Sequence, residues 1–529
     1  MRHFTTTMTR GLRDTGGNVL PIAAIAMLVA AAVVGSAVDI SRSYRVKNRL
    51  QSACDAAVLA GRHAVSTKGF DDAAEKAANN YFNVNFNDSD QETTGTQFTP
   101  SSSDNGVTVN GTASTTLSTL IMRLFGFNDF SLTVTCASSM GMGNADVMMV
   151  LDTTGSMAWA LDDTTRIEAL REAMKNFYRT VTTATSGTNA RVRYGFVPYS
   201  SSVNVGKLIY DLDPDYLVDE RTYQSRVYNS KTDKWTYKEI EYDVSKYKAF
   251  QTVATNTGND WQEWGYYEGE PRTVYSTWKG CIEERATTPA VEFKYNSSDG
   301  KITPVSARDV DLDDAPEVYD DDTKWAPMWP EVAYVRYGKF GDYTTKESNS
   351  GARAWSFCPY QAQLLREMEE DSFDNYADSL NAEGSTYLDI GMIWGGRLLS
   401  PDGMFKDNVN AAPSNGGEVS RHIIFMTDGE MAPNYEIQQA WGMEYWDRRV
   451  TANGSQHDAR RHTSRFLAVC EAIKAKGIRV WAIAFAAGLS DDLKTCASAD
   501  SSFVAADADE LNAAFQEIAN EVGELRVTS

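Results

Sequence analysis

The sequence predicts a mixed α/β protein, in which an apolar N-terminal helix and a small α+β domain precede a doubly wound, mostly parallel α/β domain. Three observations support this prediction. An uncharged run covers Val19–Val38, and a region with helical and then strand-like patterns follows it. From Asp146 onward, short apolar strands alternate with amphipathic helices. An aromatic-rich segment at about 207–374 interrupts this alternation, and we expect it to form an inserted subdomain.

Length and composition also favour more than one folded unit. The chain has 529 residues, and a single hydrophobic core rarely extends beyond about 250–300 residues. Hydrophobic residues make up 42% of the chain, which is enough to form such cores. The formal charge of −22 opposes binding to phosphate backbones, so we expect no nucleic-acid partner.

The uncharged run is long enough to cross a membrane. As a helix that rises about 1.5 Å per residue, Val19–Val38 spans about 30 Å, the thickness of the hydrocarbon core of a bilayer. We predict a transmembrane helix over 19–40, with residues 1–18 as a cytoplasmic tail. A cleaved signal peptide is an alternative, because the Gly-Ser-Ala sequence at 35–37 resembles a cleavage site. A buried helix of a soluble protein is a further alternative.

The cysteines, rather than the charged residues beside the apolar run, indicate how the predicted transmembrane helix is oriented in the membrane. Basic residues flank the apolar run on both sides, so the positive-inside rule does not decide. The chain has six cysteines and no CxxC motif, and an even number fits disulfides in an oxidising compartment. The simplest pairing follows their order along the chain, and free buried thiols remain the alternative for each pair. This pairing is Cys54–Cys136, Cys281–Cys358 and Cys470–Cys496. We therefore expect the C-terminal bulk to be exported.

A helix and a small α+β domain are predicted over 41–140. The stretch SRSYRVKNRLQSACDAAVLAGRHAV contains no proline, and its apolar residues recur at helical spacing. These residues are Val46, Leu50, Ala53, Ala57 and Val58. A second helical stretch covers about 70–86, and the segments GVTVNGTAS and FSLTVTCASS alternate as strands do.

The N-terminal pattern resembles that of the TadE/TadG-like pilus-assembly proteins of Flp pilus systems. The family pattern combines a Gly-Asn start, an apolar span, an Asp near the end of the span and a helix with the motif LQ-x-A-x-DAA-x-LAG. The chain matches this motif with Leu50, Gln51, Ala53, Asp55, Ala56, Ala57, Leu59, Ala60 and Gly61. The resemblance implies a bacterial single-pass protein of the inner membrane, with its C-terminal bulk in the periplasm or on the cell surface. Other pilus or secretion components are then the expected partners.

The segment 145–529 carries the doubly wound α/β pattern. Short and nearly all-apolar runs are typical of parallel strands that are buried on both faces. The predicted strands are VMMVLD, RVRYGFVPYS, HIIFMTD and IRVWAIAFA. The predicted helices between and after them include RIEALREAMKNFYRTV, DIGMIWGGRLL, TSRFLAVCEAIKAKG and ELNAAFQEIANEV.

Three loops of this domain together predict a metal site. Asp152, Thr154 and Ser156 follow the first strand, Thr386 precedes a helix, and Asp428 follows the HIIFM strand. Ligands of open α/β sheets bind outside the carboxyl ends of the strands. Carboxylate and hydroxyl oxygens suit a hard divalent cation, Mg²⁺ first, with Mn²⁺ or Ca²⁺ as alternatives. The competing interpretation is that these residues only cap helices and turns.

The five residues resemble the metal-ion-dependent adhesion site (MIDAS) of von Willebrand factor A domains, whose pattern is Asp-x-Ser-x-Ser, a distant Thr, and an Asp in Thr-Asp-Gly. Thr154 replaces the first Ser of the pattern and keeps its hydroxyl. The phrase GSTYLDIGMIWGGRLLSP also resembles the corresponding part of TadG-like proteins.

Together, the two resemblances imply a non-enzymatic pilus-assembly or adhesion component that binds an acidic residue of a protein partner through the ion. No nucleophile–base pair that would indicate catalysis is recognisable in the sequence. Two other functions stay open: an accessory subunit of an ATPase or chelatase machine, and a purely structural scaffold.

Overall fold

The chain folds into two compact units, Met1–Met140 and Gly141–Ser529. The computed structural model describes residues 19–65, 70–103, 108–139, 144–186, 189–258, 270–335, 347–348, 351–454 and 459–524. The predicted cytoplasmic tail, residues 1–18, lies outside these described residues.

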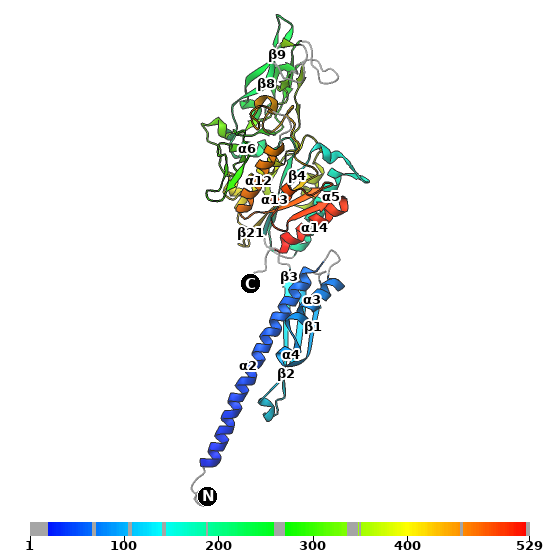
Figure 1. Ribbon diagram of the computed structural model, residues 1–529, viewed down its shortest axis with the longest axis vertical. Helices are drawn as coiled ribbons and strands as arrows, with labels where there is room; N and C mark the ends of the chain where they lie inside the picture. The colour runs from blue at the N-terminus through cyan, green and yellow to red at the C-terminus, as the bar shows by residue number, and fades with distance from the viewer. Residues whose placement is uncertain are drawn as a thin grey trace, which may run out of the picture. The chain divides into compact units, whose positions relative to one another are not determined.

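A single long helix, α2 (Val19–His63), begins the first unit. It contains the apolar run and continues without a break into the helix predicted at the start of 41–140. Among the described residues it is the one helix that is long and apolar enough to cross a membrane. Large apolar side chains on its N-terminal half, such as Ile22, Leu28 and Val33, are exposed. Figure 1 shows this half extending beyond the small sheet of the same unit.

The second half of α2 packs against a small sheet and a second helix. The apolar residues that recur at helical spacing are all buried: Val46, Leu50, Ala53, Ala57 and Val58. Their partners include Phe82 of a second helix and Val109 and Val134 of the sheet. The elements of this part are α3 (Asp72–Asn85), α4 (Asp88–Gln91), β1 (Thr93–Ser101), β2 (Thr108–Ser118), η1 (Met122–Phe125) and β3 (Asp129–Ser139). The three strands are antiparallel, in the order β1-β2-β3.

A six-stranded sheet organises the second unit, which is mixed α/β as predicted. Its strand order is β20 (Gln363–Arg366), β7 (Val192–Tyr199), β4 (Asn144–Asp152), β21 (Val419–Thr427), β23 (Arg479–Phe485) and β24 (Ser502–Ala505). The pairs from β7 to β24 are parallel, and β20 adds to β7 in the antiparallel direction. The four segments predicted as strands are β4, β7, β21 and β23.

The two faces of this sheet bury two different cores. Along β4, Val147, Met149 and Leu151 belong to one core, and Met148 and Val150 belong to the other. This alternation is the period of two that a strand imposes on its side chains. Since both sets are apolar, β4 appears in the sequence as a continuous apolar run.

Helices supply the other side of each core. On one side lie α5 (Arg166–Thr185), α8 (Glu370–Asp378) and α14 (Ala508–Glu524). On the other side lie α9 (Leu388–Leu399) and α12 (Ala459–Ala475). Short elements complete this part of the chain: η2 (Gly155–Ala158), β5 (Ala160–Leu161), β6 (Thr164–Thr165), α10 (Lys406–Val409), α11 (Glu444–Asp447) and α13 (Asp491–Cys496).

The aromatic-rich segment forms short strands and hairpins, with β8 (Glu220–Asn229) and β9 (Lys234–Asp243) as the longest pair. Many of its large rings, including Trp235, Trp325 and Trp329, are buried in cores. The strand β20 lies inside the range predicted for the insert, 207–374, yet it joins the main sheet. The segment also contains short helices: α6 (Gly206–Leu212), η3 (Pro214–Tyr216), α7 (Ser245–Lys248), η4 (Arg308–Val310) and η5 (Asp321–Thr323). Its other strands, with the partner strand β22, are β10 (Val253–Gly258), β11 (Arg272–Ser276), β12 (Ile282–Glu283), β13 (Lys294–Asn296), β14 (Lys301–Thr303), β15 (Ala326–Pro327), β16 (Tyr334–Val335), β17 (Glu347–Ser348), β18 (Ala352–Arg353), β19 (Trp355–Ser356) and β22 (Ile437–Gln438).

All six cysteines are paired in the order predicted from the sequence. The disulfides are Cys54–Cys136, Cys281–Cys358 and Cys470–Cys496. The first joins α2 to β3, the second closes part of the aromatic-rich segment, and the third joins α12 to α13. Three disulfides fit a chain whose bulk folds in an oxidising compartment.

A matched pair of substitutions on α2 tests how the first unit is held together. Leu50 is fully buried, whereas Leu59 on the same helix is 42% exposed. We expect Leu50→Ala to destabilise this unit by about 2–5 kcal/mol, because it removes buried methyl groups and leaves a cavity. Leu59→Ala should cost less than about 1 kcal/mol. Hydrogen exchange of residues 42–139 in the full chain measures both, and equal effects would contradict the packing of α2 described here.

Candidate metal centre

The main sheet brings two of the predicted loops to the same edge. β4 ends at Asp152 and β21 ends at Thr427, and the two strands are parallel neighbours with Leu151 opposite Met426. The residues that follow these strands therefore emerge side by side. Thr427 confirms this proximity, since its hydroxyl donates a 2.8 Å hydrogen bond to Oδ2 of Asp152.

A chain of hydrogen bonds joins four of the five predicted residues. The backbone N–H of Thr154 donates to Oδ1 of Asp152 at 2.9 Å. The hydroxyl oxygens of Thr154 and Ser156 lie 3.0 Å apart. Ser156 in turn donates to Oδ1 of Asp428 at 2.7 Å. The oxygens of Thr154, Ser156 and Asp428 thus converge on one place, although the two loops are far apart in the sequence.

The loop that carries Thr386 lies against both of the others. The backbone N–H of Gly155 donates to the carbonyl of Gly384 at 2.9 Å. The N–H of Ala432, in the loop after Asp428, donates to the carbonyl of Thr386 at 2.9 Å. Thr386 itself is buried, at 7% exposed, whereas Gly384 and Ser385 before it are half-buried.

Gly384 gives this loop a conformation that other residues rarely adopt. Its φ is +89°, in the left-handed region, and an added Cβ would meet the hydroxyls of Ser200 and Ser201 at about 3 Å. Ser201 also accepts a hydrogen bond from the N–H of Ser385 at 2.9 Å. Ser200 and Ser201 directly follow β7, the neighbour of β4, so a third strand end supports the site.

Two buried carboxylates make the site electrostatically unusual. Asp152 and Asp428 are 0% and 3% exposed. Burial and the nearby charge of Asp428 raise the pKa of the Asp152 carboxyl to about 6. The hydroxyl of Tyr199, whose pKa burial raises well above its ordinary value, donates to Oδ2 of Asp152 at 3.3 Å. A cation at this place would offset the repulsion between the two carboxylates.

Arg166, like Tyr199, contacts the site and was not predicted from the sequence. Arg166, the first residue of α5, places Nη1 at 2.8 Å from Oδ2 of Asp428. Its guanidinium also lies 5.1 Å from the ring centre of Trp159, which is 62% exposed. The capping box formed by Thr165 and Glu168 is a local signal that α5 begins at Arg166, but it does not report the contact with Asp428.

The residues present fit a hard divalent cation. They supply carboxylate and hydroxyl oxygens, which Mg²⁺ prefers, and they supply no sulfur or imidazole. Over the part of the chain that the structure describes, no three His, Cys, Asp or Glu side chains gather closely enough to hold an ion. An ion at this site would therefore depend on hydroxyls and water for much of its coordination.

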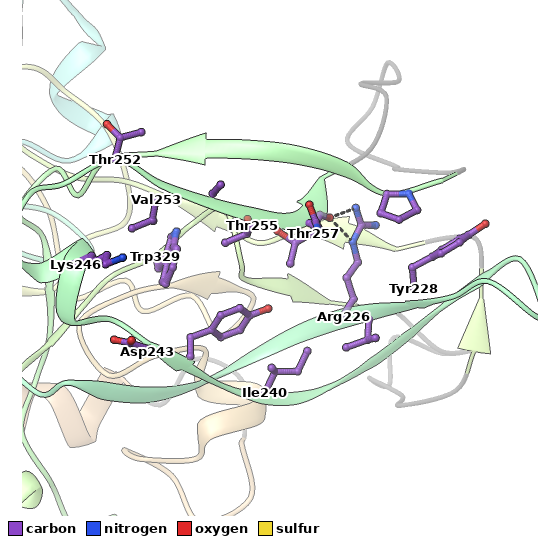
Figure 2. A pocket seen from close by; sticks show the side chains of 15 residues that line it. Arg226, Tyr228, Ile240, Asp243, Lys246, Thr252, Val253, Thr255, Thr257 and Trp329 are labelled. Atoms are coloured by element: carbon purple, nitrogen blue, oxygen red, sulfur yellow. Dashed lines mark hydrogen bonds between the residues drawn. The ribbon is translucent and has the colours of Figure 1, made fainter.

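A separate cavity lies in the aromatic-rich segment. It has a volume of about 700 Å³. Figure 2 shows Thr255 and Thr257 on one side of it, Ile240 and Asp243 on the other, and Trp329 toward one end. The buried guanidinium of Arg226 donates to the carbonyl of Thr257 at 2.6 Å, which fixes β8 against β10. None of the residues that line this cavity belongs to the three loops of the metal site.

Comparisons with known proteins give a family for the N-terminal part. Residues 17–75 match the family model described as "Putative Flp pilus-assembly TadE/G-like". Comparison with curated proteins gives no match.

Several solved structures are similar at low identity. The von Willebrand factor domain of the type V pili tip protein Mfa5 from Porphyromonas gingivalis is 11% identical, with a TM-score of 0.30, over 73% of this chain and 98% of that one. The PilB minor pilin from Streptococcus sanguinis is 11% identical, with a TM-score of 0.32, over 81% and 78%. The pilus adhesin SpaC from Lactobacillus rhamnosus GG is 12% identical, with a TM-score of 0.31, over 81% of this chain and 34% of its own.

These structural similarities are too distant to establish a fold or a function, and the chain spans only about a third of the length of SpaC. The family match is more specific, because it falls on the segment whose apolar span and LQ-x-A-x-DAA-x-LAG motif predicted it. The N-terminal part of the chain, residues 17–75, is thus a TadE/G-like Flp pilus-assembly domain.

Proposed function

We propose that this chain is a non-enzymatic, membrane-anchored component of a Tad/Flp pilus system, and that it binds a protein partner through a divalent cation. In this proposal the second unit is a doubly wound domain of the von Willebrand factor A type. The ion, Mg²⁺ in the first place, is held at a MIDAS-type site. The observation that carries the proposal is the chain of hydrogen bonds from Asp152 through Thr154 and Ser156 to Asp428.

The chemistry of the site explains how it would bind a partner. A divalent ion supplies positive charge and open coordination positions, and an Asp or Glu of the partner can fill one of them. Hydroxyls of Thr154, Ser156 and Thr386 would contribute neutral ligands. Few charged ligands leave the ion strongly attractive to an incoming carboxylate. Beside it, Trp159 is 62% exposed and offers an apolar contact of the kind that dominates many interfaces.

The pilus setting and the export of the bulk rest on three further observations. Residues 17–75 match the pilus-assembly family model, and α2 has the length and hydropathy of a membrane-spanning helix. Three disulfides, one in the first unit and two in the second, favour an oxidising compartment for both units. We therefore propose a single-pass inner-membrane protein whose bulk is periplasmic or on the cell surface.

Topology separates this function from that of a cytoplasmic accessory subunit of an ATPase or chelatase. Two reporters are fused separately after Val527. Alkaline phosphatase should be active, because it folds only after export, and green fluorescent protein should not fluoresce. Fusions after Arg49 should give the same result. A fluorescent, phosphatase-inactive fusion after Val527 would place the bulk in the cytoplasm and contradict the proposal.

Removing Asp152 tests the ion itself. We expect the melting temperature of the full chain to rise with added Mg²⁺ or Mn²⁺, because an ion that binds only the folded state stabilises it by about 2.7 kcal/mol at one hundred times its Kd. Asp152→Ala should abolish this rise. Asp163→Ala is the matched control, since Asp163 is an exposed acidic residue nearby in the chain and should leave the rise unchanged.

An equal rise in Asp152→Ala and wild type would show that the ion binds elsewhere. A different pair of results would support the purely structural scaffold. In that case the ion raises the melting temperature, yet the chain binds as much of its partner in excess EDTA as it does in Mg²⁺.

Arg166 should set how tightly the ion binds. Its guanidinium lies 2.8 Å from Asp428 and therefore repels a cation that approaches the same carboxylate. We expect Arg166→Gln to tighten Mg²⁺ binding by about tenfold, which corresponds to about 1.4 kcal/mol. Arg179→Gln, on the same helix but paired with Glu370 and Asp374, should not change it. Calorimetric titration measures both variants. Weaker binding in Arg166→Gln would mean that Arg166 instead positions Asp428 for the ion.

A further inference from the structure

The turn between β2 and β3 exposes a cluster of large apolar side chains. We call residues 119–128 the tip; it contains η1 (Met122–Phe125). Four of its side chains are strongly exposed: Leu120 at 50%, Leu124 at 77%, Phe125 at 48% and Phe127 at 62%. Soluble surfaces rarely gather so many large apolar groups in so short a segment, and such clusters mark contacts with proteins or membranes.

The tip is fastened to α2 by one buried carboxylate. Asp39 is 1% exposed, and its two oxygens accept hydrogen bonds from three backbone N–H groups at the start of the tip. The donors are Leu120 at 2.9 Å, Ile121 at 2.8 Å and Met122 at 2.8 Å. This charged residue at the end of the apolar run is therefore satisfied by protein, and it fixes the tip against the helix.

Gly35 allows the tip to lie directly against the helix. An added Cβ at this position would lie 2.2 Å from Cγ2 of Ile121, so no larger residue fits without displacing the tip. The contacts at Gly35 and Asp39 are one turn apart on α2. Figure 1 shows the turn between β2 and β3 beside the helix, within the same unit.

These two contacts determine the level of the tip along the membrane-spanning helix. From Val19, a rise of about 1.5 Å per residue places Gly35 about 24 Å and Asp39 about 30 Å along the axis. The hydrocarbon core of a bilayer is about 30 Å thick. If α2 enters the core near Val19, the tip lies where the helix leaves it.

The composition of the tip suits that level. Its one charged residue, Arg123, is exposed and basic, so its guanidinium can reach lipid phosphates while its stem stays in the apolar region. Aromatic side chains such as Phe125 and Phe127 also favour the boundary region of a bilayer over water. The opposite ends of β2 and β3 carry no comparable exposed group among the described residues.

We propose that the tip inserts into the outer interface of the membrane and is a second membrane contact of this protein, next to α2. The occupant of the exposed cluster is the lipid of the bilayer that α2 crosses. The two contacts together hold the first unit at a defined depth and limit the tilt of α2. The proposal rests on α2 spanning the membrane and is independent of the metal centre.

Spin labels on the full chain test this proposal in nanodiscs that each hold one copy in phosphatidylcholine and phosphatidylglycerol. Because all native cysteines are in disulfides, Leu124→Cys and Phe127→Cys each provide a single reactive thiol. For each spin label, we compare two collision rates: the rate with oxygen, which concentrates in lipid, and the rate with a nickel chelate, which stays in water. Val84→Cys is the control, since Val84 is 84% exposed on α3, whose contact with α2 lies near Gly61.

We expect a several-fold higher ratio of oxygen to nickel collisions at both tip positions than at Val84. Ratios at Leu124 and Phe127 equal to that at Val84 would overturn the proposal and would indicate that another protein covers the tip. A high ratio of oxygen to nickel collisions cannot come from contact with a second copy of the chain, because each nanodisc contains only one.

Discussion

The parallel pairing of β4 with β21 is the constraint on which the candidate site depends. This pairing places Asp152 beside Thr427, so that two carboxylates from distant parts of the sequence share one buried place. Each would be costly there alone, and hydroxyls, backbone N–H groups and Arg166 offset the cost. The third loop follows from the same arrangement, because Gly384 bonds to the turn after β4 and Thr386 to the turn after β21. A change that shifted the register of these strands would therefore remove the site as a whole.

The first unit depends on a different kind of constraint, which is one uninterrupted helix. The N-terminal half of α2 exposes apolar side chains, and the second half buries Leu50 and Ala57 against the small sheet. Where these halves meet, Asp39 is buried, and three backbone N–H groups satisfy its carboxylate. The apolar half and the half that packs on the small sheet are consequently parts of one helix, and the contacts of Asp39 fix the position of the tip along it.

Regular patterns made much of this fold predictable. The helical spacing of Leu50 and Ala57 and the apolar run of β4 reflect burial, which is what periodicity detects. β20 and β24 escaped prediction because they have four residues each and lie at the edges of the sheet. The site could be assembled because its loops follow recognisable strands and a known motif. The ion pair between Arg166 and Asp428 joins residues 262 positions apart, and no local pattern reports such a contact. Exposure of the tip was equally invisible, because an apolar turn has the same composition whether it is buried or not.

The most direct test of the central claim is to locate the ion. Crystals of the protein soaked in Mn²⁺ should show an anomalous-scattering peak at about 2.2 Å from the hydroxyl oxygens of Ser156 and Thr154, next to Asp428. The same peak should be absent from crystals of Asp152→Ala. The account would be contradicted by a structure in which Mn²⁺ is bound elsewhere and the side chains of Arg166 and Ser156 still donate hydrogen bonds to the two carboxylate oxygens of Asp428.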